Sequence, residues 1–64
     1  MTLEEQLQVI PETEMIYLLY DKKEFMGYKH HIFEYKLCLD RKVKRVDVCW
    51  FDDDEAYLCI EVEE

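Results

Sequence analysis

Apolar residues at the start of the chain recur with the spacing of a helix. They stand at positions i, i+4 and i+7: Leu3, Leu7 and Ile10. Thr2 and Glu5 have the spacing of a capping box, in which each side chain accepts a hydrogen bond from the other residue's backbone amide. The sequence therefore predicts a short helix that ends before Pro11, because the residue before a proline avoids the α region.

A run of β-forming residues follows from Met15 to Tyr20 and is too short for a buried helix, so it predicts a strand. The segment Asp21 to Glu24 is polar and predicts a turn. Phe25 to Ile32 then predicts a second strand that returns as a hairpin. Gly27, the only glycine of the chain, indicates a bulge or a close backbone approach within it.

The second half of the chain predicts a helix and another hairpin. Phe33 to Arg41 contains no glycine or proline and favours a short helix. Val43 to Phe51 and Ala56 to Val62 alternate apolar and polar residues on either side of an acidic turn, which predicts two antiparallel strands. Residues 1–64 are thus expected to form a single small α+β domain of order αββαββ with a four-stranded, largely antiparallel sheet.

Both faces of this sheet are predicted to be apolar. One face would lie beneath the helices and hold Val46, Val48, Trp50, Leu58 and Ile60. The other face would still present Cys49, Phe51, Tyr57 and Cys59. A face in contact with water is usually more polar than this, so either helices cover both faces or a partner covers the second one, and the pattern favours a homo-oligomer.

Composition is compatible with a folded domain, and charge divides it into three parts. Half of the residues are apolar and nine are aromatic, although the net charge is −8. Residues 1–21 hold five acids and no bases, and residues 46–64 hold eight acids and no bases. All eight lysines and arginines lie in residues 22–45, beside three acids. The chain is acidic at both ends and basic in the middle.

The basic middle segment is a candidate nucleic-acid-binding surface. Its bases are interleaved with Phe25, Tyr28, Phe33 and Tyr35, as in surfaces that bind phosphates and stack bases. The candidate residues are Lys22, Lys23, Lys29, Lys36, Arg41, Lys42, Lys44 and Arg45. The alternative is that these bases pair with the acidic strands of the same molecule or of a second copy.

The most concentrated acidic cluster is a candidate metal site. Asp52, Asp53 and Asp54 lie at the predicted hairpin turn, where neighbouring carboxylates are suited to Mg²⁺. The spacing differs from that of an EF-hand, and the alternative is a solvated hairpin tip. A cofactor is otherwise not expected. His30 and His31 are adjacent, so on a strand they would point to opposite faces and could not chelate one metal together.

Other residue types narrow the chemistry and the compartment. The chain contains no serine or asparagine, which excludes a serine nucleophile from this sequence. Cys38, Cys49 and Cys59 form no C-x-x-C pair, which favours buried thiols in a reducing cytoplasm over disulfides or zinc. No apolar run approaches the roughly 18 residues that span a bilayer, so no membrane partner is expected.

The order of segments resembles that of small proteins encoded by phages and prophages of Firmicutes. The likeness rests on Met1 to Glu5 leading to Ile10 and Pro11, a strand ending at Asp21, Leu39 to Val43 leading into a strand, and the final segment Ile60 to Glu63. Within this group the chain looks most like a small type II-A anti-CRISPR family. That family is associated with oligomers of a four-stranded, nucleic-acid-binding fold and with nicking of supercoiled DNA.

The resemblance implies a counter-defence role in the cytoplasm of a bacterial host. One hypothesis is a binding protein that blocks a defence nuclease or its DNA substrate, for example as an acidic DNA mimic in a basic channel. A second is a weak metal-dependent enzyme that nicks DNA with acids such as Asp21 or Asp52 to Asp54, with Mg²⁺ as cofactor. A third is a structural or regulatory prophage protein. No functional residue of the family is carried over to this chain.

Overall fold

The first helix forms where the capping box predicts it. The computed structural model describes residues 1–52 and 54–64, and it places α1 at Leu3–Gln8. The Glu5 amide donates to Thr2 Oγ1 at 3.3 Å, and the Thr2 amide donates to Glu5 Oε1 at 3.0 Å. The Glu5 carboxylate accepts from the Thr2 amide and also from the Thr2 hydroxyl, and these two bonds hold the pKa of the Glu5 carboxyl below its ordinary value, since they favour the charged form. The predicted start of the helix is therefore confirmed.

The first hairpin is tighter than its sequence predicts. Strand β1 spans Ile16–Tyr20 and strand β2 spans Lys23–Gly27, so only Asp21 and Lys22 form the turn. Both have positive φ, 47° and 63°, as in the two-residue turns whose twist matches that of paired strands. The predicted four-residue turn was wrong, because Lys23 and Glu24 belong to β2.

The second helix lies earlier in the chain than predicted. Helix α2 spans Lys29–Tyr35, so the predicted strand from Phe25 to Ile32 ends at Gly27, and the predicted helix from Phe33 to Arg41 is shifted. Ile32 is fully buried and fixes the helix on the sheet. Lys36 then takes a left-handed conformation, with φ 53°, which ends the helix and directs the chain toward the next strand.

The remaining strands form where they were predicted, and the four strands make a mixed sheet. Strand β3 spans Val43–Trp50 and strand β4 spans Ala56–Val62. The strand order is β2-β1-β4-β3. The outer pairs β1–β2 and β3–β4 are antiparallel, whereas the central pair β1–β4 is parallel. The predicted αββαββ order and α+β class are confirmed, and the parallel central pair qualifies the antiparallel expectation.

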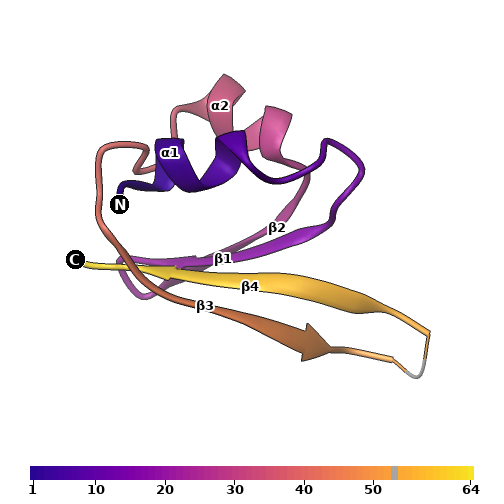
Figure 1. Ribbon diagram of the computed structural model, residues 1–64. Coiled ribbons are helices and arrows are strands. Elements are labelled where there is room, and N and C mark those ends of the chain that lie inside the picture. Colours follow the sequence, from indigo (N-terminus) through magenta and orange to yellow (C-terminus); the bar gives the residue numbers. More distant parts are fainter. Residues whose placement is uncertain (53) are drawn as a thin grey trace.

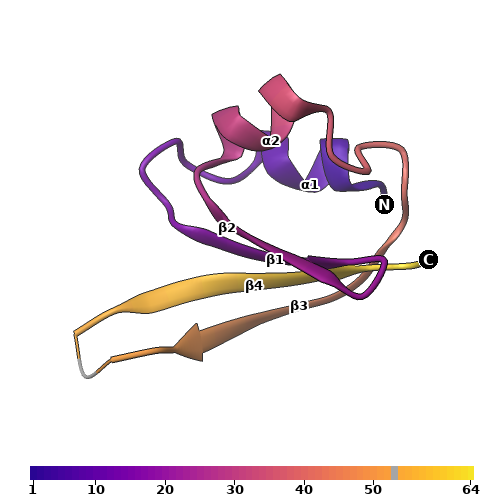
Figure 2. The ribbon, with the colours of Figure 1, turned by 180° about the vertical axis from the view of Figure 1, so that it is seen from behind.

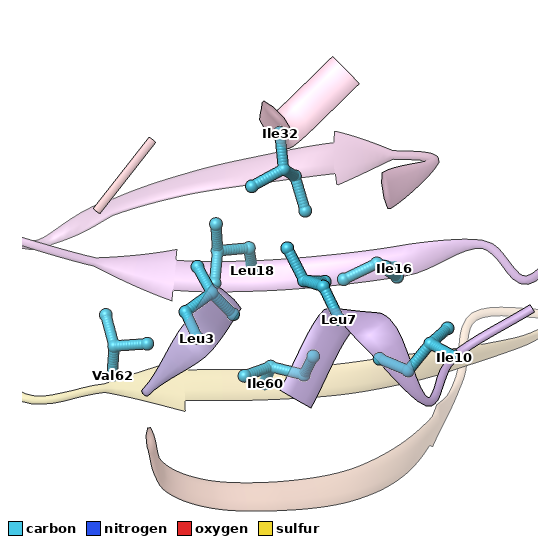
Figure 3. Packing of buried hydrophobic residues seen from close by; sticks show 8 residues of the cluster. All are labelled: Leu3, Leu7, Ile10, Ile16, Leu18, Ile32, Ile60 and Val62. Atoms are coloured by element: carbon cyan, nitrogen blue, oxygen red, sulfur yellow. The ribbon is translucent and has the colours of Figure 1, made fainter. Parts of the chain in front are cut away.

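Both helices lie on the same face of the sheet (Figures 1 and 2). Between them and the sheet is a single cluster of buried aliphatic side chains, which Figure 3 shows pointing toward one another. The cluster consists of Leu3, Leu7, Ile10, Ile16, Leu18, Ile32, Ile60 and Val62. Across the described residues, none of the helices has the length and apolar character needed to cross a membrane.

Gly27 ends β2 at a close approach to an aromatic ring. A Cβ atom there would lie 2.9 Å from Phe25 Cζ, which is closer than real Cβ contacts. Gly27 pairs with Ile16 in regular register, so the position is no bulge. The sequence left open a bulge or a close backbone approach at this glycine, and the structure shows the close approach.

The helices leave β3 uncovered. Val46, Val48 and Trp50 pair with Ile60, Leu58 and Ala56 of β4, so their side chains lie on the helix side of the sheet. They are nevertheless 41%, 56% and 68% exposed. The expectation that they lie beneath the helices was wrong, because α1 and α2 are only 6 and 7 residues long. The β3–β4 hairpin extends beyond both helices (Figure 1).

Candidate binding face

The face of the sheet turned away from the helices is called the open face here. Its residues alternate with the buried ones: next to Ile16 and Leu18 of β1, Tyr17 and Leu19 point to the other side. Cross-strand register extends this face over all strands, and its apolar members are Tyr17, Leu19, Met26, Cys49, Tyr57 and Cys59. The open face thus carries the apolar residues that the sequence predicts without a helix over them. The same register places four charged residues on it as well: Glu24, Arg45, Asp47 and Glu61.

An aromatic cluster lies at one end of the open face. The ring centroids of Tyr17 and Phe51 are 5.2 Å apart, and those of Phe51 and Tyr57 are 4.7 Å apart at an interplanar angle of 64°. Such tilted, edge-to-face pairs match the charge distribution of aromatic rings. Phe51, which follows β3, remains 48% exposed. The cluster is therefore a preformed aromatic surface that a partner can contact.

Two thiols lie beside the aromatic cluster. Cys59 faces Asp47 across the β3–β4 pair, and Cys49 faces Tyr57, so the two cysteines are diagonal neighbours. Burial, and then a hydrogen bond with Cys49, raise the pKa of the Cys59 thiol to about 11. Cys59 is a buried neutral thiol, as the sequence predicts for it; Cys49 and Cys38 are partly exposed.

Carboxylates edge the aromatic cluster. Tyr57 donates its hydroxyl proton to Glu55 Oε2 at 3.4 Å, and Asp52 and Asp54 lie in the same β3–β4 turn. Partial removal from water, and then the nearby Glu55 carboxylate, raise the pKa of the Tyr57 phenol. The phenol therefore stays a neutral hydrogen-bond donor beside negative charge.

Within the described part of the chain, three of the candidate nucleic-acid-binding residues form ion pairs with acidic side chains of the same molecule. Lys44 Nζ lies 3.7 Å from Glu61 Oε2, and Arg45 Nη2 lies 3.4 Å from Glu61 Oε1. Arg41 forms an ion pair with Asp21 in the first hairpin turn. Its guanidinium holds the pKa of the Asp21 carboxyl below the ordinary value. These contacts support the sequence-based alternative that some of the bases pair with acids of the same molecule.

The other candidate nucleic-acid-binding residues belong to separate elements of the fold. Lys29 donates to the Leu7 carbonyl at 3.3 Å and so joins α2 to the end of α1. Lys22 and Lys23 line an open hollow of about 580 Å³ together with Lys44. The same hollow is lined by Asp21, Glu61, Glu63 and Glu64, so its charge is mixed. Lys36 caps α2, and Lys42 is exposed just before β3.

The aromatic residues of the basic segment do not form one surface. Phe25 and Phe33 pack against the buried core, whereas Tyr35 is exposed. His30 and His31 lie on α2, not on a strand, and their ring centroids are 4.0 Å apart. The expectation that these histidines point to opposite faces of a strand was therefore wrong, because the helix begins before them.

The candidate metal site lies partly outside the described residues. Asp52 and Asp54 are exposed in the β3–β4 turn, and Asp53 is not among the described residues. Within residues 1–52 and 54–64, no group of three histidine, cysteine, aspartate or glutamate side chains gathers as a metal would require. The metal site stays a hypothesis from the sequence.

The aromatic cluster was missed in the sequence, although two of its members were placed on the second face. Phe51 and Tyr57 were expected there through the alternation of the β3–β4 hairpin. Tyr17 joins them only because β1 lies parallel to β4, with Tyr17 opposite Cys59. The alternation of Tyr17 with the apolar Ile16 and Leu18 in the strand could have indicated that its side chain points to the second face. The position of β1 beside β4 had no local signal.

Comparison with known proteins gives no family for this chain. No protein-family model, no curated protein and no solved structure matches it significantly.

Proposed function

We propose that this protein is a binding protein that blocks a bacterial defence nuclease by docking on its basic, nucleic-acid-binding surface. The observation that carries the proposal is the aromatic cluster of Tyr17, Phe51 and Tyr57 with carboxylates at its edge. Aromatic rings are enriched at protein interfaces because they contribute a large apolar area and orient specifically. Arginine side chains of a partner would stack on the ring faces and donate hydrogen bonds to the carboxylates there.

The charge of the open face favours a basic protein over a nucleic acid. Surfaces that bind single strands combine aromatic rings with free bases that neutralise phosphates. Here Lys44 and Arg45 lie beside Glu61, and the aromatic cluster adjoins Glu55. Negative charge at this position repels phosphates and attracts lysines and arginines. This complementarity, together with the resemblance to small type II-A anti-CRISPR proteins, supports a nuclease as the partner.

The proposal is tested by titrating the purified protein into a guide-loaded type II-A CRISPR nuclease, with calorimetry and a DNA-cleavage assay as readouts. We expect binding, inhibition of cleavage, and an affinity that falls as salt rises. Phe51→Ala removes an exposed ring and should weaken the affinity by about tenfold or more. Asp52→Lys should weaken binding as well, because it reverses a charge beside the aromatic cluster.

The matched control is Glu34→Lys, which reverses an exposed carboxylate on α2, in the helix layer. It should bind like the unmodified protein. Absence of binding, or equal affinities for Phe51→Ala, Asp52→Lys and Glu34→Lys, would contradict the proposed docking face.

A further inference from the structure

Among the described residues, the backbone of β3 is unpaired on its outer side beyond the start of the strand. The strand lies at the edge of the sheet beside β4. At its start the outer side is covered, because the Val43 amide donates to the Met1 carbonyl at 2.8 Å and Thr2 pairs with Lys42. The Phe51 amide donates to the Glu55 carbonyl at 3.2 Å, so the backbone of Phe51 faces β4. Backbone groups of successive residues point to alternate sides in a strand. Those of Val46, Val48 and Trp50 therefore point toward the free edge.

A contact at Val48 agrees with this assignment. Its amide donates to the side chain of the preceding residue, Asp47 Oδ1, at 2.9 Å. A backbone amide that faced β4 would bond to that strand instead. The Asp47 carboxylate thus satisfies an amide that the sheet leaves open.

The side chains at the same positions are the exposed apolar ones. Val46, Val48 and Trp50 are 41%, 56% and 68% exposed on the helix side of the sheet. We call these residues the β3 edge. The edge strand on the other side of the sheet is different, since Met26 is the one exposed large apolar residue of β2. The β3 edge therefore combines uncovered apolar side chains with backbone groups that no other described strand pairs, of which the Val48 amide bonds to the Asp47 side chain in the single copy.

We propose that two copies of this chain join through their β3 edges in antiparallel fashion and double the four-stranded sheet. Val48 lies on the two-fold axis and pairs with Val48 of the second copy, and Val46 pairs with Trp50 in both directions. Residues with outward backbone groups then exchange hydrogen bonds, and their apolar side chains cover one another. Asp47 lies opposite Cys49 of the second copy, so no like charges face each other.

Neighbouring registers fit less well. Moving the axis to Asp47 would place two carboxylates opposite each other at the closest kind of antiparallel pair. Moving it to Val46 would pair Trp50 with Lys42 and extend the contact across the register shift between Val43 and Arg45. The register centred on Val48 is the one that pairs all three exposed apolar residues of the β3 edge with one another, and this match selects a second copy as the occupant of the edge.

The self-association goes beyond the proposed docking on a nuclease. The response to salt distinguishes the two proposals. Each copy carries a net charge of −8, so two copies repel each other over distance. Added salt screens this repulsion and should strengthen the dimer. Docking of the acidic open face on a basic partner should weaken under the same change. Failure of one proposal is therefore distinguishable from failure of the other.

Analytical ultracentrifugation of the full chain over a concentration and salt series tests the proposal. We expect a monomer–dimer equilibrium for the unmodified protein. Val48→Lys places two lysines opposite each other on the axis and should weaken the dimer at least about tenfold. Val9→Lys is the matched control, because Val9 is 72% exposed at the end of α1, away from the edge, and this variant should dimerise normally. A monomer at every concentration, or equal dimerisation by both variants, overturns the proposal.

A cross-link tests the register without disturbing the apolar side chains of the β3 edge. Asp47→Cys is combined with Cys59→Ala, because Cys59 lies opposite position 47 within the same copy and would form a disulfide there. Oxidised with glutathione disulfide, this double variant should give a dimer linked between position 47 of one copy and Cys49 of the other, as mapped by peptide mass spectrometry. Residues opposite each other in such a pair lie within the Cα separation that a disulfide requires. Recovery of this variant as an unlinked monomer, or with links at other cysteines alone, overturns the proposed register.

Discussion

The two halves of the helix-side sheet surface differ although their strands have the same alternating pattern. Ile60 of β4 is fully buried, and its direct neighbour across the strands, Val46 of β3, is 41% exposed. The difference comes from the helices, which cover β1 and β4 and stop short of β3 (Figure 1). Alternation therefore fixes the direction of a side chain, and the layer above it decides whether that side chain is buried.

The comparison separates a part of the chain that stabilises the fold from a part that is available for binding. The covered half holds the aliphatic cluster around Leu18 and Ile60. The uncovered half holds the β3 edge. The open face with its aromatic cluster lies on the opposite side of the sheet and has no helix over it either. Substitutions should therefore act on folding in one half and on association in the other.

The largest expected contrast is between truncations on the two sides of this division. Leu18→Ala removes a fully buried side chain and should lower the free energy of unfolding by about 2–5 kcal/mol. Val48→Ala removes an exposed side chain and should change it by less than about 0.5 kcal/mol under dilute, monomeric conditions. Urea denaturation measures both. Similar losses in the two variants would refute the division.

A smaller loss of unfolding free energy is expected when the N-terminal cap of α1, one of the two helices that cover the sheet, is weakened. Thr2→Ala removes the hydroxyl that accepts from the Glu5 amide, and should cost about 0.5–2 kcal/mol in unfolding free energy. Thr13→Ala is the control, because Thr13 is exposed in the loop before β1. Chemical denaturation should leave this control close to the unmodified protein. A harmless Thr2→Ala would show that the capping box does not hold α1 on the sheet.

The smallest expected effect concerns an exposed ion pair in the first hairpin turn. Arg41 lowers the pKa of Asp21 in the folded state below its ordinary value of 3.8. A carboxyl with a depressed folded pKa contributes stability above its unfolded pKa, and this contribution is lost as the pH falls through the folded value. Asp21→Asn should therefore show a shallower loss of stability below about pH 4 than the unmodified protein.

Thermal unfolding between neutral pH and pH 2 measures this difference. Asp40→Asn provides the control, since no ion pair of Asp40 occurs among the described residues. An acid response of Asp21→Asn as steep as that of the Asp40→Asn control would contradict a stabilising role of the pair.

Local signals in the sequence were sufficient for α1, β3 and β4. The Thr2 and Glu5 pair, Pro11 and the alternation after Val43 act over a few residues, so they can be recognised without the fold. The end of α2 depends on a left-handed backbone conformation at Lys36. Lysine does not favour this conformation, so the sequence does not predict the end of the helix. The two-residue turn at Asp21 and Lys22 likewise lacks the glycine or asparagine that would mark it.

The binding surfaces could be predicted only in part, because they depend on contacts between distant segments. The apolar second face was visible in Cys49, Phe51, Tyr57 and Cys59. The aromatic cluster also needs the parallel pairing of β1 with β4, which brings Tyr17 to Phe51. The exposure of Trp50 depends on the lengths of two helices elsewhere in the chain.

Trp50 itself gives the most direct test of the account that the uncovered half of the sheet is a surface for association. It is the only tryptophan of the chain, and it is 68% exposed in the single copy. Its fluorescence should shift to shorter wavelength, and become less accessible to acrylamide, as the protein concentration or the salt concentration rises. Val48→Lys should keep the spectrum of an exposed tryptophan throughout. An exposed-tryptophan spectrum of the unmodified protein at every concentration would contradict the account.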